Sequence, residues 1–185
     1  MKRVFIAIKT ESEGPVYKVI TSLKSELRNE IIKWTDLDNL HITLLFLGKT
    51  EEEKLDIISS VLKEECYGFG HLEIIIRGIG LFKNLNEPRV IWAGIEPSER
   101  LNILNRNIAN RFRNLGFYQG ENYFKPHLTL GRIKTIVNRQ DFKTIVDKYK
   151  ATELQNLIIE EIILYESILL PEGPVYKPID KFSLK

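Results

Sequence analysis

The chain is poor in the residues on which disulfides and many metal sites are built. It has one cysteine, Cys66, and three histidines among 185 residues. One cysteine excludes an internal disulfide and a cysteine-rich zinc site. It also suits a reducing cytosol, so we expect a cytoplasmic protein.

Long apolar runs and a strong net charge are also missing. No apolar run approaches the roughly 20 residues that span a bilayer. The N-terminal run is too short for a signal peptide and is closed by Lys9 and Glu11. A net charge of +2 permits a nucleic-acid partner without demanding one. Neither a Gly-x-Ser-x-Gly elbow nor a Gly-x-x-x-x-Gly-Lys loop occurs, which argues against a serine hydrolase and against nucleoside triphosphate hydrolysis.

A short motif occurs twice in the chain. His41-Ile42-Thr43 begins one apolar segment and His127-Leu128-Thr129 begins another, at an offset of 127 − 41 = 86 residues. Two of the three histidines therefore head the same tripeptide. The third, His71, has no threonine two positions on, and we expect it to be structural or exposed.

The segments around the two motifs recur in the same order. The predicted strand at residues 3–8 matches residues 89–94 at an offset of 86, and predicted helix faces recur at offsets of 85 and 87. The pattern predicts an internal duplication and an α+β fold. We expect one bilobal domain over residues 1–185, with halves at 1–84 and 85–185. It would contain two antiparallel sheets related by a pseudo-twofold axis, helices on the outer faces and a central cleft.

Several local signals mark the ends of elements. Thr50 with Glu53 predicts a capping box, and Asn138 with Asp141 predicts a second helix cap. Gly116 predicts the end of the helix before it. One long strand is expected over residues 157–169, followed by a closing strand over residues 175–184.

The side chains of the repeated tripeptide are suited to a definite kind of chemistry. Residues i and i+2 of a strand share a face, so each histidine lies beside its threonine. Imidazole can act as a general acid or base near neutral pH, and a threonine hydroxyl can donate to a phosphate oxygen. Two histidines on opposite sides of a cleft suit an in-line displacement at phosphorus. A lone histidine is more often structural, and the spacing that favours metal binding, His-x-His or His-x-x-x-His, is absent.

The motifs resemble those of the two-histidine (2H) phosphoesterase superfamily. His41-Ile42-Thr43-Leu44-Leu45-Phe46-Leu47-Gly48 is similar to the first motif of its RNA 2′,3′-cyclic phosphodiesterase branch, historically called 2′-5′ RNA ligases. The stretch from Pro126 to Arg132 is similar to the second. Flanking strands and the tail from Ser167 to Tyr176 extend the resemblance over essentially the whole chain.

This resemblance implies a function and roles for the motif residues. It implies hydrolysis of RNA 2′,3′-cyclic phosphates to 2′-phosphomonoesters, with no metal or cofactor and with 2′-5′ ligation as a side activity. His41 would be the proton donor and His127 the proton acceptor, while Thr43 and Thr129 hold the phosphate oxygens. The expected partner is RNA with a cyclic phosphate end, such as a tRNA half, or a small cyclic nucleotide. We expect the protein to be a monomer. The alternative is a non-catalytic protein that binds RNA ends or nucleotides in the same cleft.

Four further residues are candidates for substrate binding. Lys125 has the strand parity of His127 and could place a cation beside the phosphate, or could be solvated. Arg132 has the opposite parity and reaches the cleft only if the strand bends at Gly131. Tyr123 and Phe124 could stack on a base, although packing is the alternative.

Overall fold

The computed structural model describes residues 1–10, 13–83, 87–117, 123–171 and 173–185. These residues form four α-helices, two short 3-10 helices and nine strands. The elements in chain order are β1 (Lys2–Lys9), α1 (Pro15–Glu26), β2 (Ile31–Trp34), η1 (Leu37–Asn39), β3 (His41–Thr50), η2 (Glu52–Lys54), α2 (Leu55–Cys66), β4 (Leu72–Phe82), β5 (Val90–Ile95), α3 (Glu99–Asn114), β6 (His127–Thr135), α4 (Arg139–Lys148), β7 (Glu153–Ile159), β8 (Glu161–Leu169) and β9 (Pro174–Ser183).

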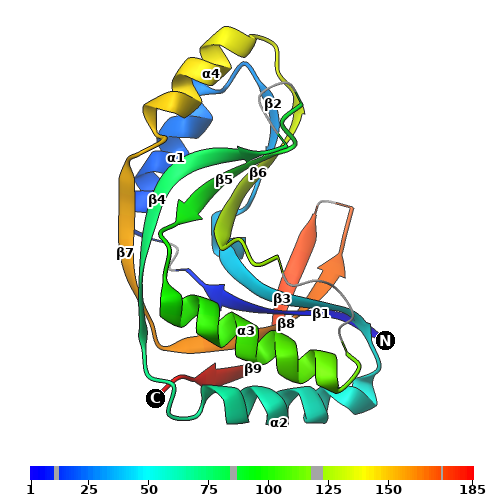
Figure 1. Ribbon diagram of the computed structural model, residues 1–185. Coiled ribbons are helices and arrows are strands. Elements are labelled where there is room, and N and C mark those ends of the chain that lie inside the picture. Colours follow the sequence, from blue (N-terminus) through cyan, green and yellow to red (C-terminus); the bar gives the residue numbers. More distant parts are fainter. Residues whose placement is uncertain (11–12, 84–86, 118–122, 172) are drawn as a thin grey trace.

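All nine strands belong to one curled sheet, in the order β7-β4-β5-β6-β3-β1-β8-β9, with β2 paired to β6 (Figure 1). The α+β class is confirmed, but the prediction of two separate sheets is wrong. The two strands that carry the repeated motif pair with each other through Ile42 and Leu128. This bridge joins the two halves of the sheet into one surface. The predicted boundary between the halves of the chain, at residues 84 and 85, lies outside the described residues.

The bridge at Ile42 and Leu128 marks the centre of a pseudo-twofold arrangement. These two residues are 86 positions apart, the offset of the repeated motif. On either side of the bridge the sheet continues in equivalent order, as β6-β5-β4-β7 in one direction and β3-β1-β8-β9 in the other. Strands from both halves of the chain build each side, since β4 pairs with β5 and β8 pairs with β1.

The match of the first strands at an offset of 86 is out of register by one residue. Thr43 pairs with Ala7, whereas its repeat partner Thr129 pairs with Trp92, which is 85 residues after Ala7. Strand parity agrees, because Ile6 and Ile91 both belong to the main core. The match of residues 3–8 with residues 89–94 at an offset of 86 therefore compares residues on opposite faces of the sheet.

The helices cover the convex face of the sheet. Figure 1 shows α1 and α4 outside one side and α2 and α3 outside the other, as predicted. The third helix has a strong apolar face, since Leu101, Leu104, Ile108 and Phe112 are fully buried. Burial of each such side chain contributes about 1.5–3 kcal/mol relative to leaving it exposed. No helix in the described part of the chain is long and apolar enough to cross a membrane.

Helix ends show which local signals were correct. The Asn138 side chain accepts from the backbone N–H groups of Gln140 and Asp141, which confirms the predicted cap of α4. Gly116 follows α3 with φ of 74°, as expected for a residue after a helix end. The Thr50 capping box is wrong. The Thr50 hydroxyl instead donates to the carbonyl of Gly48, 3.4 Å away, and a 3-10 turn precedes α2.

The prediction of one continuous strand over residues 157–169 is also wrong. The chain breaks at Glu160, whose carbonyl accepts from the N–H of Leu184, and it forms β7 and β8 on opposite sides of the sheet. The short strand β2 was not predicted. It adds to the edge of β6.

Candidate active site

The two motifs lie on the concave face of the sheet, which the helices leave uncovered. Ile42 and Leu128 point into the main core, so strand alternation turns the flanking histidines and threonines to the opposite face. His41, Thr43, His127 and Thr129 are all half-buried there. A small second apolar cluster on the same face contains Phe5, Ala7, Ile163 and Tyr165.

Pairing of β3 with β6 brings the two motifs together at the centre of this face. The strands are antiparallel with Ile42 opposite Leu128. One step in either direction sets His41 opposite Thr129 and Thr43 opposite His127. Each histidine therefore lies opposite the threonine of the other copy.

Aromatic rings pack around His41, on one side of the point where the two motifs meet. Its Nδ1 donates to the carbonyl of Asn39 at 2.7 Å. A carbonyl can only accept, so Nδ1 carries the hydrogen and Nε2 remains to exchange a proton. The ring centroid lies 5.1 Å from that of Phe5 and 5.0 Å from that of Tyr176, which meets it edge-on.

The setting of His127 repeats this plan with different side chains. Its Nδ1 donates to the carbonyl of Lys125, again at 2.7 Å. The ring lies 4.7 Å from Phe82, edge-on, and 6.4 Å from Trp92. Lys125 places its ammonium over these same two rings, 5.4 Å from Phe82 and 5.0 Å from Trp92.

Both imidazoles favour the neutral form in the free protein. Burial lowers the pKa of His41, the hydrogen bond to Asn39 opposes that shift, and the charge of His127 lowers the pKa further. Burial also lowers the pKa of His127, with the hydrogen bond to the Lys125 carbonyl opposing and the Lys125 ammonium adding to the shift. An anionic substrate between the rings would favour protonation of both.

Arg132 reaches the same face because β6 contains an extra residue. Thr129 pairs with Trp92 and Gly131 with the adjacent Ile91, so Leu130 is inserted and the parity changes. Arg132 then pairs with Val90, on the face of Trp92 and Thr129. Burial raises the pKa of Tyr176, whose ring packs beside His41, and the charge of the Arg132 guanidinium partly offsets this rise.

Phe46 is a candidate that the sequence did not single out. It stands 86 residues before Arg132, and β3 has a matching irregularity between Thr43 and Leu45 opposite Ala7 and Ile6. Phe46 therefore returns to the concave face, where its side chain is 67% exposed. Its ring centroid lies 5.8 Å from that of Phe5. The sequence signal that could have identified Phe46 is its offset of 86 residues from Arg132, which equals the offset between the two motifs.

The other candidates fall into different environments. Tyr123 is 86% exposed and Phe124 packs half-buried against the core. Packing is thus an observed role of Phe124, while base stacking by either residue stays a prediction. His71 is exposed, as expected, with its Nε2 3.9 Å from Glu73.

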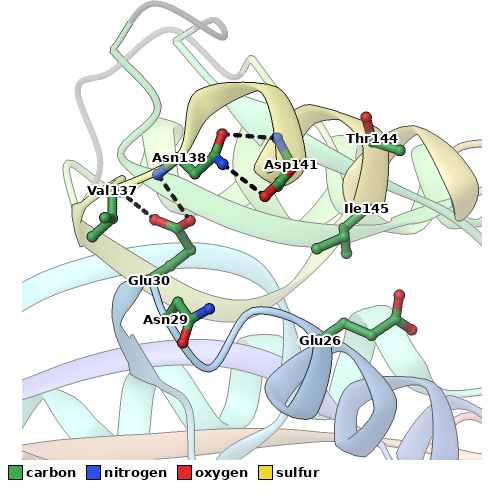
Figure 2. Close-up of a pocket in the computed structure, with 8 residues that line it drawn as sticks. All are labelled: Glu26, Asn29, Glu30, Val137, Asn138, Asp141, Thr144 and Ile145. Atoms are coloured by element: carbon green, nitrogen blue, oxygen red, sulfur yellow. Dashed lines mark hydrogen bonds between the residues drawn. The ribbon is translucent and has the colours of Figure 1, made fainter.

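A cavity of about 660 Å³ lies away from both motifs, between the end of α1 and the start of α4 (Figure 2). The Glu30 carboxylate accepts from the backbone N–H groups of Val137 and Asn138 at its edge. The lining includes neither histidine of the motifs. Among the described residues, no three His, Cys, Asp or Glu side chains gather as a metal site would require.

Comparison with known proteins identifies the family of the chain. The family model for LigT-like phosphoesterases matches residues 8–92 and 95–176. The chain belongs to this family. An RNA 2′,3′-cyclic phosphodiesterase of Methanothermobacter thermautotrophicus is 33% identical over 184 residues, covering 98% of each chain. One of Archaeoglobus fulgidus is 34% identical over 186 residues, covering 98% of this chain and 99% of the relative.

Solved structures of LigT-like folds superpose over nearly the whole chain. A crystal structure from Thermus thermophilus has a TM-score of 0.82 and 28% identity, and covers 98% of this chain and 97% of that chain. The E. coli LigT complexed with 3′-AMP has a TM-score of 0.78 at 22% identity, with the same coverage. At that identity the E. coli structure supports the shared fold alone.

Proposed function

We propose that this LigT-like phosphoesterase hydrolyses RNA 2′,3′-cyclic phosphates to 2′-phosphomonoesters by acid–base catalysis with two histidines. The observation that carries the proposal is the meeting of two His-Thr pairs at one bridge of the sheet, with both Nδ1 atoms held by carbonyls. The names of the relatives support the same substrate class.

Two proton transfers flank the displacement at phosphorus. Nε2 of neutral His127 takes a proton from water as the water oxygen bonds to phosphorus. The bond from phosphorus to the ribose 3′ oxygen breaks, and Nε2 of protonated His41 gives its proton to that oxygen. The phosphate stays on the 2′ oxygen. Each such transfer is worth typically about 10²–10⁴ in rate.

Other residues of the concave face would hold the substrate. Thr43 and Thr129 donate to the non-bridging oxygens, and the Arg132 guanidinium adds a charge-assisted contact. The leaving 3′ oxygen lies on the His41 side, so the terminal nucleoside lies there too. The exposed ring of Phe46 on that side offers a surface on which a base can stack. The same displacement with a 5′ hydroxyl in place of water would break the same bond to the 3′ oxygen and give 2′-5′ ligation.

A product assay with matched variants tests the proposal. RNA ending in a 2′,3′-cyclic phosphate is incubated with EDTA present, and the 2′- and 3′-phosphate products are separated. We expect the 2′-phosphate, and a loss of at least about 100-fold in His41→Ala and in His127→Ala. A phosphodiester with a p-nitrophenolate leaving group, which needs no proton, should rescue His41→Ala only.

Three results would count against it. Rescue of His127→Ala instead would reverse the acid and base. Loss of activity in EDTA with recovery on added zinc or manganese would replace the metal-free mechanism. Full activity in either alanine variant would remove the two-histidine mechanism.

A further inference from the structure

The two copies of the site share one backbone plan and differ in one charged side chain. The carbonyl two residues before each histidine accepts from its Nδ1, at 2.7 Å in both copies. That carbonyl belongs to Asn39 in the first copy and to Lys125 in the second. The two positions are 86 residues apart, as the histidines are. The pseudo-twofold axis therefore relates a neutral amide to an ammonium.

The surroundings of Lys125 hold its charge beside His127. The ammonium stands over Trp92 and Phe82, the two rings that also contact His127. Trp92 lies against Gly80, where an added Cβ would collide with its ring, and it also lies near Gly94. A cation over two aromatic faces is attracted by the negative potential of both rings. The amide of Asn39 instead donates to the carbonyl of Pro174, 3.4 Å away.

We propose that Lys125 is a positioning residue that assigns the acid and base roles, by holding a positive charge beside His127 that the equivalent Asn39 does not hold beside His41. The charge opposes protonation of His127 and so favours it as the acceptor. Phe5 and Tyr176 surround His41 without adding a charge. This inference rests on the proposed function, in which the two histidines need opposite protonation states.

The charged groups around His127 are few among the described residues. His41 faces it from β3, and the charge of His127 lowers the pKa of His41. Lys125 comes from the segment just before β6, and its charge lowers the pKa of His127. The strands β4 and β5 present the uncharged rings of Phe82 and Trp92. Arg132 of β6 lies farther along the same face, beyond Thr129. Lys125 is the charged side chain that shares the rings of Phe82 and Trp92 with His127.

The test is an NMR titration of the histidine rings of the full chain, joined to pH–rate profiles. In Lys125→Asn the pKa of His127 should rise. The acidic limb of kcat/KM should then move to higher pH, because His127 must be neutral to act. We expect the ratio of kcat/KM at pH 5 to kcat/KM at pH 8 to be about threefold to tenfold lower in the variant than in the wild type. This is the effect expected for the loss of one unit charge several ångströms from His127 near a surface.

Matched variants separate charge from packing. Lys125→Arg keeps the charge and should keep the pKa of His127. Lys134→Asn removes a charge on the same strand, seven residues or about 23 Å from His127, and should leave both measurements unchanged. The reciprocal Asn39→Lys should lower the pKa of His41. Thermal unfolding of each variant checks that the fold is kept.

The outcomes distinguish this inference from the proposed function. An unchanged pKa of His127 in folded Lys125→Asn would overturn the inference, whatever happens to the rate. The same result in Lys125→Arg as in Lys125→Asn would also overturn it, because the charge would then not be the cause. Failure of the wild-type protein to hydrolyse cyclic phosphate RNA would instead overturn the proposed function, since the titration does not depend on turnover.

Discussion

Ile42 and Leu128 pair directly across the middle of the sheet, and they are equivalent residues of an internal repeat. Because the pseudo-twofold axis passes between them, their neighbours cross over. Each histidine meets the threonine of the other copy. A substrate group that lies on the axis would thus have one histidine and one threonine on either side. An in-line displacement requires proton-transfer groups on two opposite sides.

The pH dependence should reflect the lowered pKa of both histidines. The kcat/KM profile reports the free enzyme, where burial lowers both values from their ordinary 6.5. We therefore expect a bell-shaped profile with its maximum below pH 6.5. The bound phosphodiester anion favours the protonated rings, so the kcat profile should lie at higher pH. Initial rates on a nucleoside 2′,3′-cyclic phosphate between pH 4.5 and 9 measure both, and a kcat/KM maximum above pH 7 would contradict this.

The two threonines should each supply one hydroxyl to the phosphate. Thr43→Ala and Thr129→Ala remove that donor, and we expect each to lower kcat by about 10–100-fold, somewhat less than loss of a full oxyanion-hole donor. Thr43→Ser and Thr129→Ser keep the hydroxyl and should retain most activity. Steady-state kinetics of the four variants measure this. Serine variants as slow as the alanine variants would point to a packing role of the methyl group instead.

Gly80 should be required for the position of Trp92. An alanine there places its Cβ against the indole ring, so the ring must move. We expect Gly80→Ala to cost about 1–3 kcal/mol in the free energy of unfolding and to lower activity, because Trp92 packs beside His127 and Lys125. Urea denaturation measures the first. Fluorescence in a Trp34→Phe background reports Trp92 alone.

A second glycine provides the comparison for that result. Gly68 has open space around its Cβ position but a φ of +67°, so Gly68→Ala tests backbone strain without crowding. It should cost about 1–2 kcal/mol and leave the Trp92 fluorescence and the activity unchanged. Equal fluorescence in wild-type protein and Gly80→Ala would contradict the prediction.

Asn138 should contribute to stability without affecting catalysis. Its side chain caps two N–H groups of α4 and also donates to Asp141 at 2.7 Å (Figure 2). Asn138→Ala should lower the free energy of unfolding by about 1 kcal/mol, whereas Asn138→Ser should retain most of the cap. Because α4 lies on the convex face, kcat/KM should stay at the wild-type value. A loss of activity in folded Asn138→Ala would show that this helix communicates with the motifs.

The sequence predicted those features that depend on local periodicity. The parity of His41 and Thr43 needed only the two-residue repeat of a strand, and the buried face of α3 needed only helical spacing. The cap at Asn138 was also local. These signals are reliable where the chain has no strong competing partner within the fold.

The errors arose where distant segments compete for a local group. Thr50 lies at the end of a strand that pairs with β1, so its hydroxyl bonds within that strand and not to a helix. The break at Glu160 depends on Leu184, a residue 24 positions later. The joining of the sheets depends on one bridge between residues 86 apart. The position of Arg132 depends on an inserted residue that becomes visible only against the register of β5.

The pairing of β8 with β1 sets a constraint on how the protein can be made. Val4 pairs with Glu166, so one long edge of the first strand has no partner until more than 160 residues have been synthesised. Contacts between such distant residues slow folding, because a long loop must close before they stabilise anything. During synthesis the growing chain presents an open strand edge, which is a template for pairing with other chains. The interleaving that centres two histidines on one axis thus leaves the first strand half-paired until β8 has been made.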